Sequence, residues 1–347
     1  MHPELNDRGR GRTRWMLLAV AGLVAAVIAA TVAPRWFETA HDRPDPAAER
    51  AAMRGMRGIP PVEPGKDSAA FDPMRRVISV GAVPGLRLSA STTARYWQTA
   101  DLEDDDGHFM VEVLAYPRGH AGMFFVPQGK VDPSAGAPAD PIGKAPAYWL
   151  PDGQWLFQYE AVRLAWQWGD GNWVFVTVAS TDDQGRRPKV PVERLRELAR
   201  GVAAAVHLDA VGTPVTMPFT MPRPSSGYRL TGTDLLRGTR LDGTPILRAT
   251  LSFRTGADPQ NPGISARDES PSLLVTAAFS TPDDKPGSVN GTVDGHPVAE
   301  HDGGAVLYEA GEGFAIEVGA GGIELARTVS ILPGARDESA WTSRPLR

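Results

Sequence analysis

Cysteine is missing from this 347-residue sequence. Its absence excludes disulfide bonds, zinc sites built on thiolates, a cysteine nucleophile and the lipid attachment of bacterial lipoproteins. An excess of basic residues is missing too, because Lys and Arg total 36 against 41 Asp and Glu. Nucleic acid, whose phosphates attract a basic surface, is therefore not an expected partner.

Motifs that mark common catalytic sites are also missing. No Gly-x-Ser-x-Gly or Ser-x-x-Lys segment supports serine catalysis. The Gly-Lys pairs at 65–66, 129–130 and 143–144 lack the following Ser or Thr of a phosphate-binding loop. We therefore predict neither an enzyme nor a cofactor. Paired catalytic carboxylates have no sequence signature, since any two acids can meet in a fold, so a cell-envelope hydrolase stays open as an alternative.

Two segments resemble metal sites only in part. His296 and His301 flank Glu300, but Pro297 interrupts any helix and the spacing differs from that of zinc-protease motifs. The acidic segment 103–107 lacks the alternating ligands of a calcium-binding EF-hand loop. A strand end with a loop and a charged turn are the preferred interpretations, and we predict no metal.

One uncharged apolar stretch runs from Trp15 to Ala33. At about 1.5 Å per residue a helix of this length nearly matches a hydrocarbon core of roughly 30 Å. Arginines precede it at positions 8, 10, 12 and 14. The positive-inside rule then predicts a single-pass protein of the cell membrane, with the basic tail 1–14 cytoplasmic and everything after the helix 15–33 extracytoplasmic. A cleaved signal peptide is the alternative, which the length of the stretch and Pro34 disfavour.

The region beyond the anchor contains an internal duplication. Four short segments recur in the same order: Gly85–Ala90 as Gly227–Gly232, Gly143–Ala147 as Gly295–Ala299, Gly169–Val178 as Gly311–Val318, and Glu197–Val202 as Glu324–Val329. We therefore predict a Pro/Ala-rich linker at 34–75, a first module copy at 76–212, a proline connector at 213–226, a second copy at 227–333 and a disordered tail at 334–347.

Each copy is expected to contain strands, then a hairpin, then a helix. In the first copy we predict a strand at 108–116, a hairpin of 161–168 with 173–178, and a helix at 191–206 with one apolar stripe. In the second copy the counterpart of the first of these strands is either 246–253 or 273–279. The predicted class is α+β: an N-terminal transmembrane helix, then two duplicated modules of antiparallel sheet, each covered by a helix.

Aromatic residues supply the candidate partner-binding residues. Trp166, Trp168 and Trp173 belong to a tryptophan-rich stretch of the first copy, where flat rings would stack on sugars or hold a peptide. The alternative is that they fill the core between sheet and helix. Met123, Phe124 and Phe125 form an apolar patch in a long loop, which binds a partner as a strand or folds back on its own domain.

The arginine-rich start, single anchor, proline spacer and Gly-Asp-Gly hairpin leading to Glu197-Leu-Ala-Arg200 carry a resemblance. With these features the sequence resembles uncharacterised single-pass membrane proteins of high-GC Gram-positive bacteria. The two copies are also similar to extracytoplasmic domains that accompany sigma-factor regulation. The resemblance implies a membrane-tethered, non-catalytic binding or sensing module for a protein or cell-envelope partner. A structural subunit of a membrane complex is a further alternative.

Overall fold

The structure, a computed structural model, describes residues 69–104, 108–120, 133–150, 161–169, 171–180, 190–225, 227–239, 245–255, 272–279, 289–301, 304–319 and 322–347. They belong to one compact unit, Val62–Gln260 with Glu269–Arg347. The expected membrane helix at 15–33 and most of the linker lie outside the described residues. In the described part of the chain, no helix is both long enough and apolar enough to span a bilayer.

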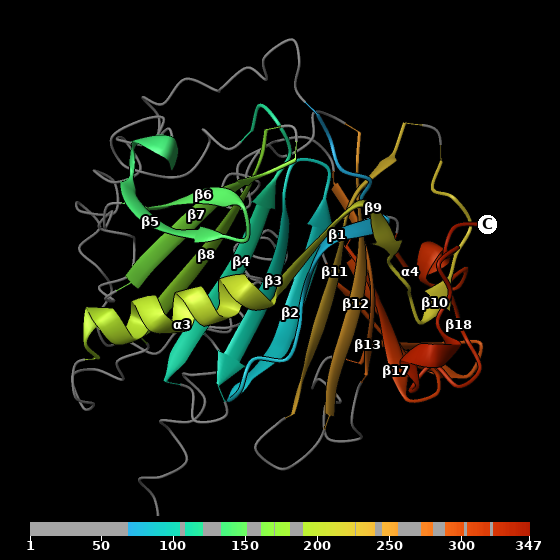
Figure 1. Cartoon of the computed structure of the whole chain (residues 1–347). Helices are drawn as coiled ribbons and strands as arrows, with labels where there is room; N and C mark the ends of the chain where they lie inside the picture. The colour runs from blue at the N-terminus through green and yellow to red at the C-terminus, as the bar shows by residue number, and fades with distance from the viewer. Residues whose placement is uncertain are drawn as a thin grey trace, which may run out of the picture. The chain divides into compact units, whose positions relative to one another are not determined.

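Among the described residues, fourteen antiparallel strands form one continuous sheet. Figure 1 shows its central strands β4, β3, β2, β11, β12 and β13 side by side. The first half of the sheet has the order β2-β3-β4-β8-β7-β6-β5. Its strands are β2 (Leu86–Ala94), β3 (Gln98–Asp104), β4 (Phe109–Tyr116), β5 (Ala137–Ile142), β6 (Ala145–Trp149), β7 (Ala161–Trp168) and β8 (Asn172–Ser180). The strand and the hairpin predicted for the first copy are therefore confirmed.

The second half of the sheet has the order β11-β12-β13-β17-β16-β15-β14, which repeats the order of the first half strand by strand. Its strands are β11 (Arg229–Thr239), β12 (Pro245–Arg254), β13 (Ser272–Phe279), β14 (Gly291–Val293), β15 (His296–His301), β16 (Gly304–Gly311) and β17 (Phe314–Val318). Both segments offered as the counterpart of β4 are strands. By position in the order, the counterpart of β4 is β13.

The two halves join through their first strands, β2 and β11, which pair antiparallel. Thr92 lies directly opposite Asp234 at the centre of this pairing, and its hydroxyl donates to Asp234 Oδ1 (2.7 Å). Thr92 and Asp234 are each seven residues after the glycine that begins the first repeated segment, Gly85 or Gly227, so equivalent residues of the two strands oppose each other and the register is symmetric. We expected two separate sheets, and the main-chain pairing of β2 with β11 makes them one.

The remaining elements lie outside the large sheet. They are β1 (Arg75–Val80), which pairs with β9 (Val206–Pro214), β10 (Phe219–Thr220), which pairs with β18 (Ser330–Ile331), the helices α3 (Val192–Ala205) and α4 (Gly322–Ala326), and the 3₁₀ turns η2 (Pro133–Ala135) and η5 (Glu338–Ala340). Helix α3 packs on β7 and β8, and α4 packs on β16 and β17. In the part of the chain that the structure describes, the fold is thus mostly antiparallel β-sheet with two short helices.

Helix α3 follows directly from its sequence. Pro191 precedes it with φ −59°, a value that suits entry into a helix, and Glu193 favours the positive end of the helix dipole. Leu195, Ala199 and Val202 recur at helical spacing and are fully buried. Burial of this stripe against the sheet provides most of the stability of so short a helix.

Two hydrophobic cores form on the helix-bearing side. The first combines α3 and β1 with strands of the first half, and the second combines α4 with strands of the second half. The second core also takes up two segments that we expected to lie outside any domain. The two segments are 213–226 and the segment after Pro333, and apolar side chains of both pack into this core.

The expected proline connector, 213–226, is largely a packed part of the second core. Val215, Met217, Phe219 and Met221 are at most 2% exposed. Every second side chain points inward because the prolines keep the backbone extended. Its main chain also pairs with the C-terminal segment. The Met217 N–H donates to the Thr342 carbonyl (2.9 Å), and the Thr342 N–H donates to the Met217 carbonyl (3.0 Å).

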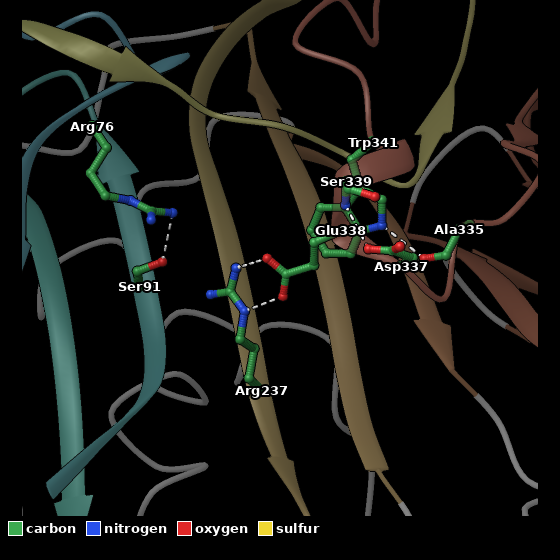
Figure 2. Close-up of polar contacts among 8 residues, drawn as sticks. All are labelled: Arg76, Ser91, Arg237, Ala335, Asp337, Glu338, Ser339 and Trp341. Carbon is green, nitrogen blue, oxygen red and sulfur yellow. Dashed lines mark hydrogen bonds and ion pairs between the residues drawn. The ribbon is translucent and has the colours of Figure 1, made fainter. Parts of the chain in front are cut away.

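The prediction of a disordered tail after Pro333 is wrong. Trp341 is buried, and its indole N–H donates to the carbonyl of Ala335 (2.8 Å). Glu338 forms a bidentate ion pair with Arg237 of β11 (2.5 and 2.6 Å; Figure 2). One large apolar side chain and one paired carboxylate fix the segment, although its composition is polar.

Candidate functional site

The face of the first half opposite α3 is the candidate site. Among the described residues no helix packs on this face, and we call it the helix-free face. On the opposite face Val113, Leu164 and Val176 belong to the core beneath α3. Successive side chains of a strand point to opposite sides of a sheet. The residues between these core positions therefore project onto the helix-free face.

A row of polar side chains crosses this face over four neighbouring strands. Asp101 of β3 is directly opposite Glu112 of β4, Glu112 is opposite Thr177 of β8, and Thr177 is opposite Arg163 of β7. The Nε of Arg163 donates to the Thr177 hydroxyl (2.9 Å). We call these four residues the charged row. All four are partly buried.

The two carboxyl groups of the charged row disturb each other. Burial raises the pKa of Asp101 well above its usual range, and the nearby carboxyl groups of Glu112 and Asp234 raise it further. Burial also raises the pKa of Glu112, while the Arg163 guanidinium opposes that rise. Like charges on directly opposed residues of a sheet are destabilising. Glu112 is therefore the member favoured in the ionised form, and Asp101 is the member favoured in the protonated form.

Arg163 and Tyr116 titrate in the same environment. Burial lowers the pKa of Arg163 to about 10, against the opposing effect of Glu112 and Tyr116. Burial raises the pKa of Tyr116, and the Glu112 carboxyl group adds to the rise. Both groups keep their usual charge at neutral pH. The site thus presents a cation, a neutral phenol and two coupled carboxyl groups.

Aromatic rings lie beside the charged row on the same face. Tyr148 of β6 is 6.4 Å from Trp173 of β8, and Trp173 is 6.4 Å from Phe175, measured between ring centroids. Tyr116 meets Phe175 edge to face at 5.8 Å. We call these four residues the aromatic patch. Phe175 and Tyr116 are buried, whereas Tyr148 and Trp173 are partly exposed.

The second half does not repeat the charged row. The positions opposite one another at the same place in its strand order are Ser252 of β12 and Leu274 of β13. The neighbouring row instead holds Thr250 and Thr276, whose buried hydroxyls bond each other (3.0 Å). The four-residue charged row is therefore found in the first half, whereas the second half holds other ionisable groups on this face, among them the ion pair of Arg248 with Glu317 (3.5 Å).

The structure separates the three predicted tryptophans. Trp166 is 3% exposed and belongs to the core under α3, and Trp168 packs against that core from a partly buried position. Trp173 alone of the three lies on the helix-free face. Its partner across the hairpin is Gln167, and Trp166 and Trp168, on either side of Gln167, point to the opposite face. Met123, Phe124 and Phe125 lie outside the described residues.

The two partial metal motifs are in different parts of the sheet. His296 and His301 are the first and last residues of β15. Glu103 pairs with Arg87 (2.7 Å), and Asp104 Oδ1 accepts from the amide of Phe109 (2.8 Å). Among the described residues, no group of three or more His, Cys, Asp or Glu side chains is arranged to hold a metal ion.

Sequence reasoning missed Asp101, Glu112 and Arg163, although the signal was present. Glu112 and Arg163 are single charged residues inside otherwise apolar strands. A charged residue in a strand that has neighbours on both sides is costly to bury, so it is a good marker of a site. What the sequence did not contain was the strand order that places these residues in one row.

Comparison with known proteins identifies no relative. No protein-family model matches the sequence, and no curated protein matches it. The crystal structure of the di-domain ARO/CYC StfQ from the steffimycin biosynthetic pathway is 13% identical over 82% of this chain and 81% of that chain, with a TM-score of 0.09. A score this low shows no shared fold and carries no argument.

Proposed function

We propose that this chain is a membrane-tethered, non-catalytic binding or sensing module that meets a protein or cell-envelope partner outside the cytoplasm. The anchor at 15–33 and the arginines before it support the tether and its orientation. The helix-free face of the first half is the proposed binding site.

The charged row is the observation that carries the proposal. Partial burial of Asp101, Glu112 and Arg163 lowers the stability of the sheet. At the positions that correspond to Asp101 and Glu112, the second half has the uncharged residues Ser252 and Leu274. Residues that cost stability without a structural return are concentrated at functional sites.

The chemistry of the site favours a partner with both polar groups and a flat apolar surface. Arg163 and Thr177 provide donors, Glu112 provides an acceptor, and Asp101 in its protonated form provides a further donor. The partly exposed rings of Tyr148 and Trp173 lie next to them. Binding sites commonly combine aromatic walls with a few well-placed polar groups.

We also propose that the two halves arose by duplication, and that the second half is mainly a scaffold. Three of the four repeated segments fall at equivalent places in the two strand orders, and the fourth begins in α3 and in α4. Both first strands carry a register shift at the same position. Ser89 at one shift donates to the Asp101 carbonyl, as Thr231 at the other donates to the Ser252 carbonyl (both 3.1 Å). The symmetric pairing of Thr92 with Asp234 resembles a two-fold subunit contact.

Site-specific photo-crosslinking in native membranes tests the binding site. A photoreactive residue replaces Trp173 on the helix-free face or, as the control, Val192, which is 37% exposed at the start of α3. We expect a defined crosslinked partner from position 173 and none from position 192. Arg163→Gln, combined with the label at position 173, should reduce that crosslink at least tenfold. Equal labelling from both positions, or labelling that Arg163→Gln leaves unchanged, contradicts the proposal.

A reporter fused after Arg347 tests the proposed orientation separately. An enzyme that is active only outside the cytoplasm should be active at this position, and one that is active only inside should be silent. The opposite pattern would place the soluble region in the cytoplasm and remove every extracytoplasmic partner.

A hydrolase is the second candidate, because Asp101 and Glu112 are directly opposed and have separated proton affinities. Directly opposed residues of an antiparallel pair have Cβ atoms about 4.5–5.5 Å apart. A protonated acid beside an ionised one is the arrangement that glycoside hydrolysis requires. The full-length protein should then release reducing ends from purified envelope polysaccharide, and Asp101→Asn and Glu112→Gln should abolish the release. No release by the wild-type protein rejects this candidate.

A further inference from the structure

A second polar cluster lies on the helix-bearing side, where four segments from both halves and the C-terminus meet. Arg76 comes from β1, Ser91 from β2, Arg237 from β11 and Glu338 from η5 (Figure 2). Arg76 Nη2 donates to the Ser91 hydroxyl (3.0 Å). Arg237 Nε and Nη2 donate to the two carboxylate oxygens of Glu338 (2.5 and 2.6 Å).

The cluster holds more positive than negative charge. Among the described residues, its two guanidinium groups face one carboxylate, that of Glu338. Burial lowers the pKa of Arg76, Arg237 lowers it further, and Glu338 only partly opposes these effects. The two arginines therefore repel each other, and Glu338 neutralises one of them through its paired bonds.

Two donors in the cluster have no acceptor among the described residues. They are Arg76 Nε and Arg237 Nη1, and both atoms are buried. A buried donor that lacks an acceptor lowers the stability of the folded state. One additional anion would provide acceptors for these donors and would neutralise the excess positive charge.

We propose that Arg76 and Arg237 form a binding site for an oxyanion, and that Glu338 is an internal competitor that occupies its Arg237 side. The planar guanidinium fork matches carboxylate and phosphate oxygens, and Arg237 already displays this geometry with Glu338. The Glu338 side chain is 45% exposed while that of Arg237 is 26% exposed, so the competitor is the more accessible of the two. Its turn, η5, is only three residues long, which allows a local displacement.

This site is independent of the proposed function. It lies on the opposite side of the sheet from the charged row, and its ligand is an anion. An incoming oxyanion would accept from both arginines and release Glu338 from Arg237. The C-terminal segment would keep its other anchors, which include the buried Trp341.

Titration of the full-length protein in detergent with inorganic phosphate or acetate, at constant ionic strength, tests the proposal by calorimetry. We expect saturable binding of at least one of the two anions. Glu338→Gln should tighten it at least tenfold, because the competitor is lost and the net charge of the cluster rises. Arg76→Gln and Arg237→Gln should each weaken it at least tenfold. The response to phosphate against acetate distinguishes a tetrahedral from a planar oxyanion.

Glu324→Gln is the matched control, since Glu324 is an exposed glutamate paired with Arg327. This variant should bind both anions as the wild type does. If Arg76→Gln does not fold, Arg76→Lys, which keeps the charge and loses the fork, replaces it and should also weaken binding. Glu338→Gln that lowers the melting temperature without tightening anion binding would show a purely structural ion pair, and would overturn the proposal. So would anion binding by Arg237→Gln at wild-type strength.

Discussion

Asp101 shows how a single residue joins stability to function in this protein. Its carboxyl group is held between those of Glu112 and Asp234, in a sheet position where the second half has a serine. A protonated Asp101 removes the repulsion and adds a donor to the site. The same arrangement costs stability whenever the proton is lost, and the cost should therefore depend on pH.

Asp101→Asn should stabilise the protein at neutral pH. The folded-state pKa of Asp101 is raised, so the wild-type chain loses stability as pH rises from about 4, the ordinary carboxyl range, to the raised value. Asparagine does not titrate and avoids that loss. We expect a gain of on the order of 1 kcal/mol at pH 7.5 that disappears near pH 4, measured by urea unfolding at each pH.

Asp140→Asn is the control for this measurement, because the Asp140 side chain is 83% exposed. Its stability should differ little from that of the wild type at both pH values. A loss of stability in Asp101→Asn at pH 7.5 would mean that the ionised form of Asp101 is the favoured one, and the proton assignment in the charged row would then be reversed.

Trp166 and Trp173 differ by the face they occupy, and alanine substitutions should separate their roles. Trp166→Ala empties a core position and should lower the free energy of unfolding by about 3–5 kcal/mol. Trp173→Ala, on the partly exposed face, should cost clearly less and should instead reduce partner capture. Denaturant unfolding with the two variants in parallel measures the difference. Equal losses of stability would show that Trp173 also serves mainly the core.

At the scale of elements, the sequence pattern predicted the helix and the hairpin that are formed by residues close together in the chain. Helix α3 and the β7–β8 hairpin were predictable because Leu195, Ala199 and Val202 follow the helical period, and Gly169 and Gly171 adopt positive φ values in the turn. The pairing of β2 with β11 has no local signature, since it joins residues 142 positions apart, such as Thr92 and Asp234. Within the charged row the β3–β4 and β7–β8 pairings are local, and only the β4–β8 pairing, which places Glu112 opposite Thr177, has no local signature.

The segment from Val215 to Met221 was misjudged because its prolines are typical of linkers. Prolines also suit an extended segment whose missing amide donors are not needed by a sheet. Here the residues between the threonine and proline positions pack into the second core. The alternation of large apolar residues at 215, 217, 219 and 221 was the stronger signal.

Met217→Ala should therefore destabilise the protein as a core substitution does. Met217 is 0% exposed in the second core, and truncation of such a side chain costs about 2–5 kcal/mol. Thr213→Ala, at an exposed position of the same segment, should stay within about 0.5 kcal/mol of the wild type. Chemical unfolding of both variants provides the measurement. Similar small effects for both would return the segment to the status of a linker.

At the scale of the whole molecule, the described part of the sheet has one continuous backbone ladder but two large hydrophobic cores, beside a small cluster of Ala299, Tyr308 and Ala315. The outer edges limit its growth, since edge strand β5 contains two prolines and edge strand β14 has only three residues. The inner edge of each half, β2 in the first and β11 in the second, is hydrogen-bonded to the other half. Pairing within one chain therefore satisfies the two strands that would otherwise invite association with another copy.

The shared ladder predicts that both halves unfold together. Separating them would expose the edges of β2 and β11 and break the Arg237–Glu338 pair, which ties the C-terminus to β11. Hydrogen exchange in urea should then give β4 and β13 the same opening free energy within about 1 kcal/mol. Trp341→Phe removes the tryptophan buried in the second core, so that tryptophan fluorescence then reports on the first half. In this variant the unfolding transition measured by fluorescence should have the same denaturant midpoint as the transition measured by circular dichroism. Two separated transitions would show that each half is stable alone and that the β2–β11 pairing contributes little.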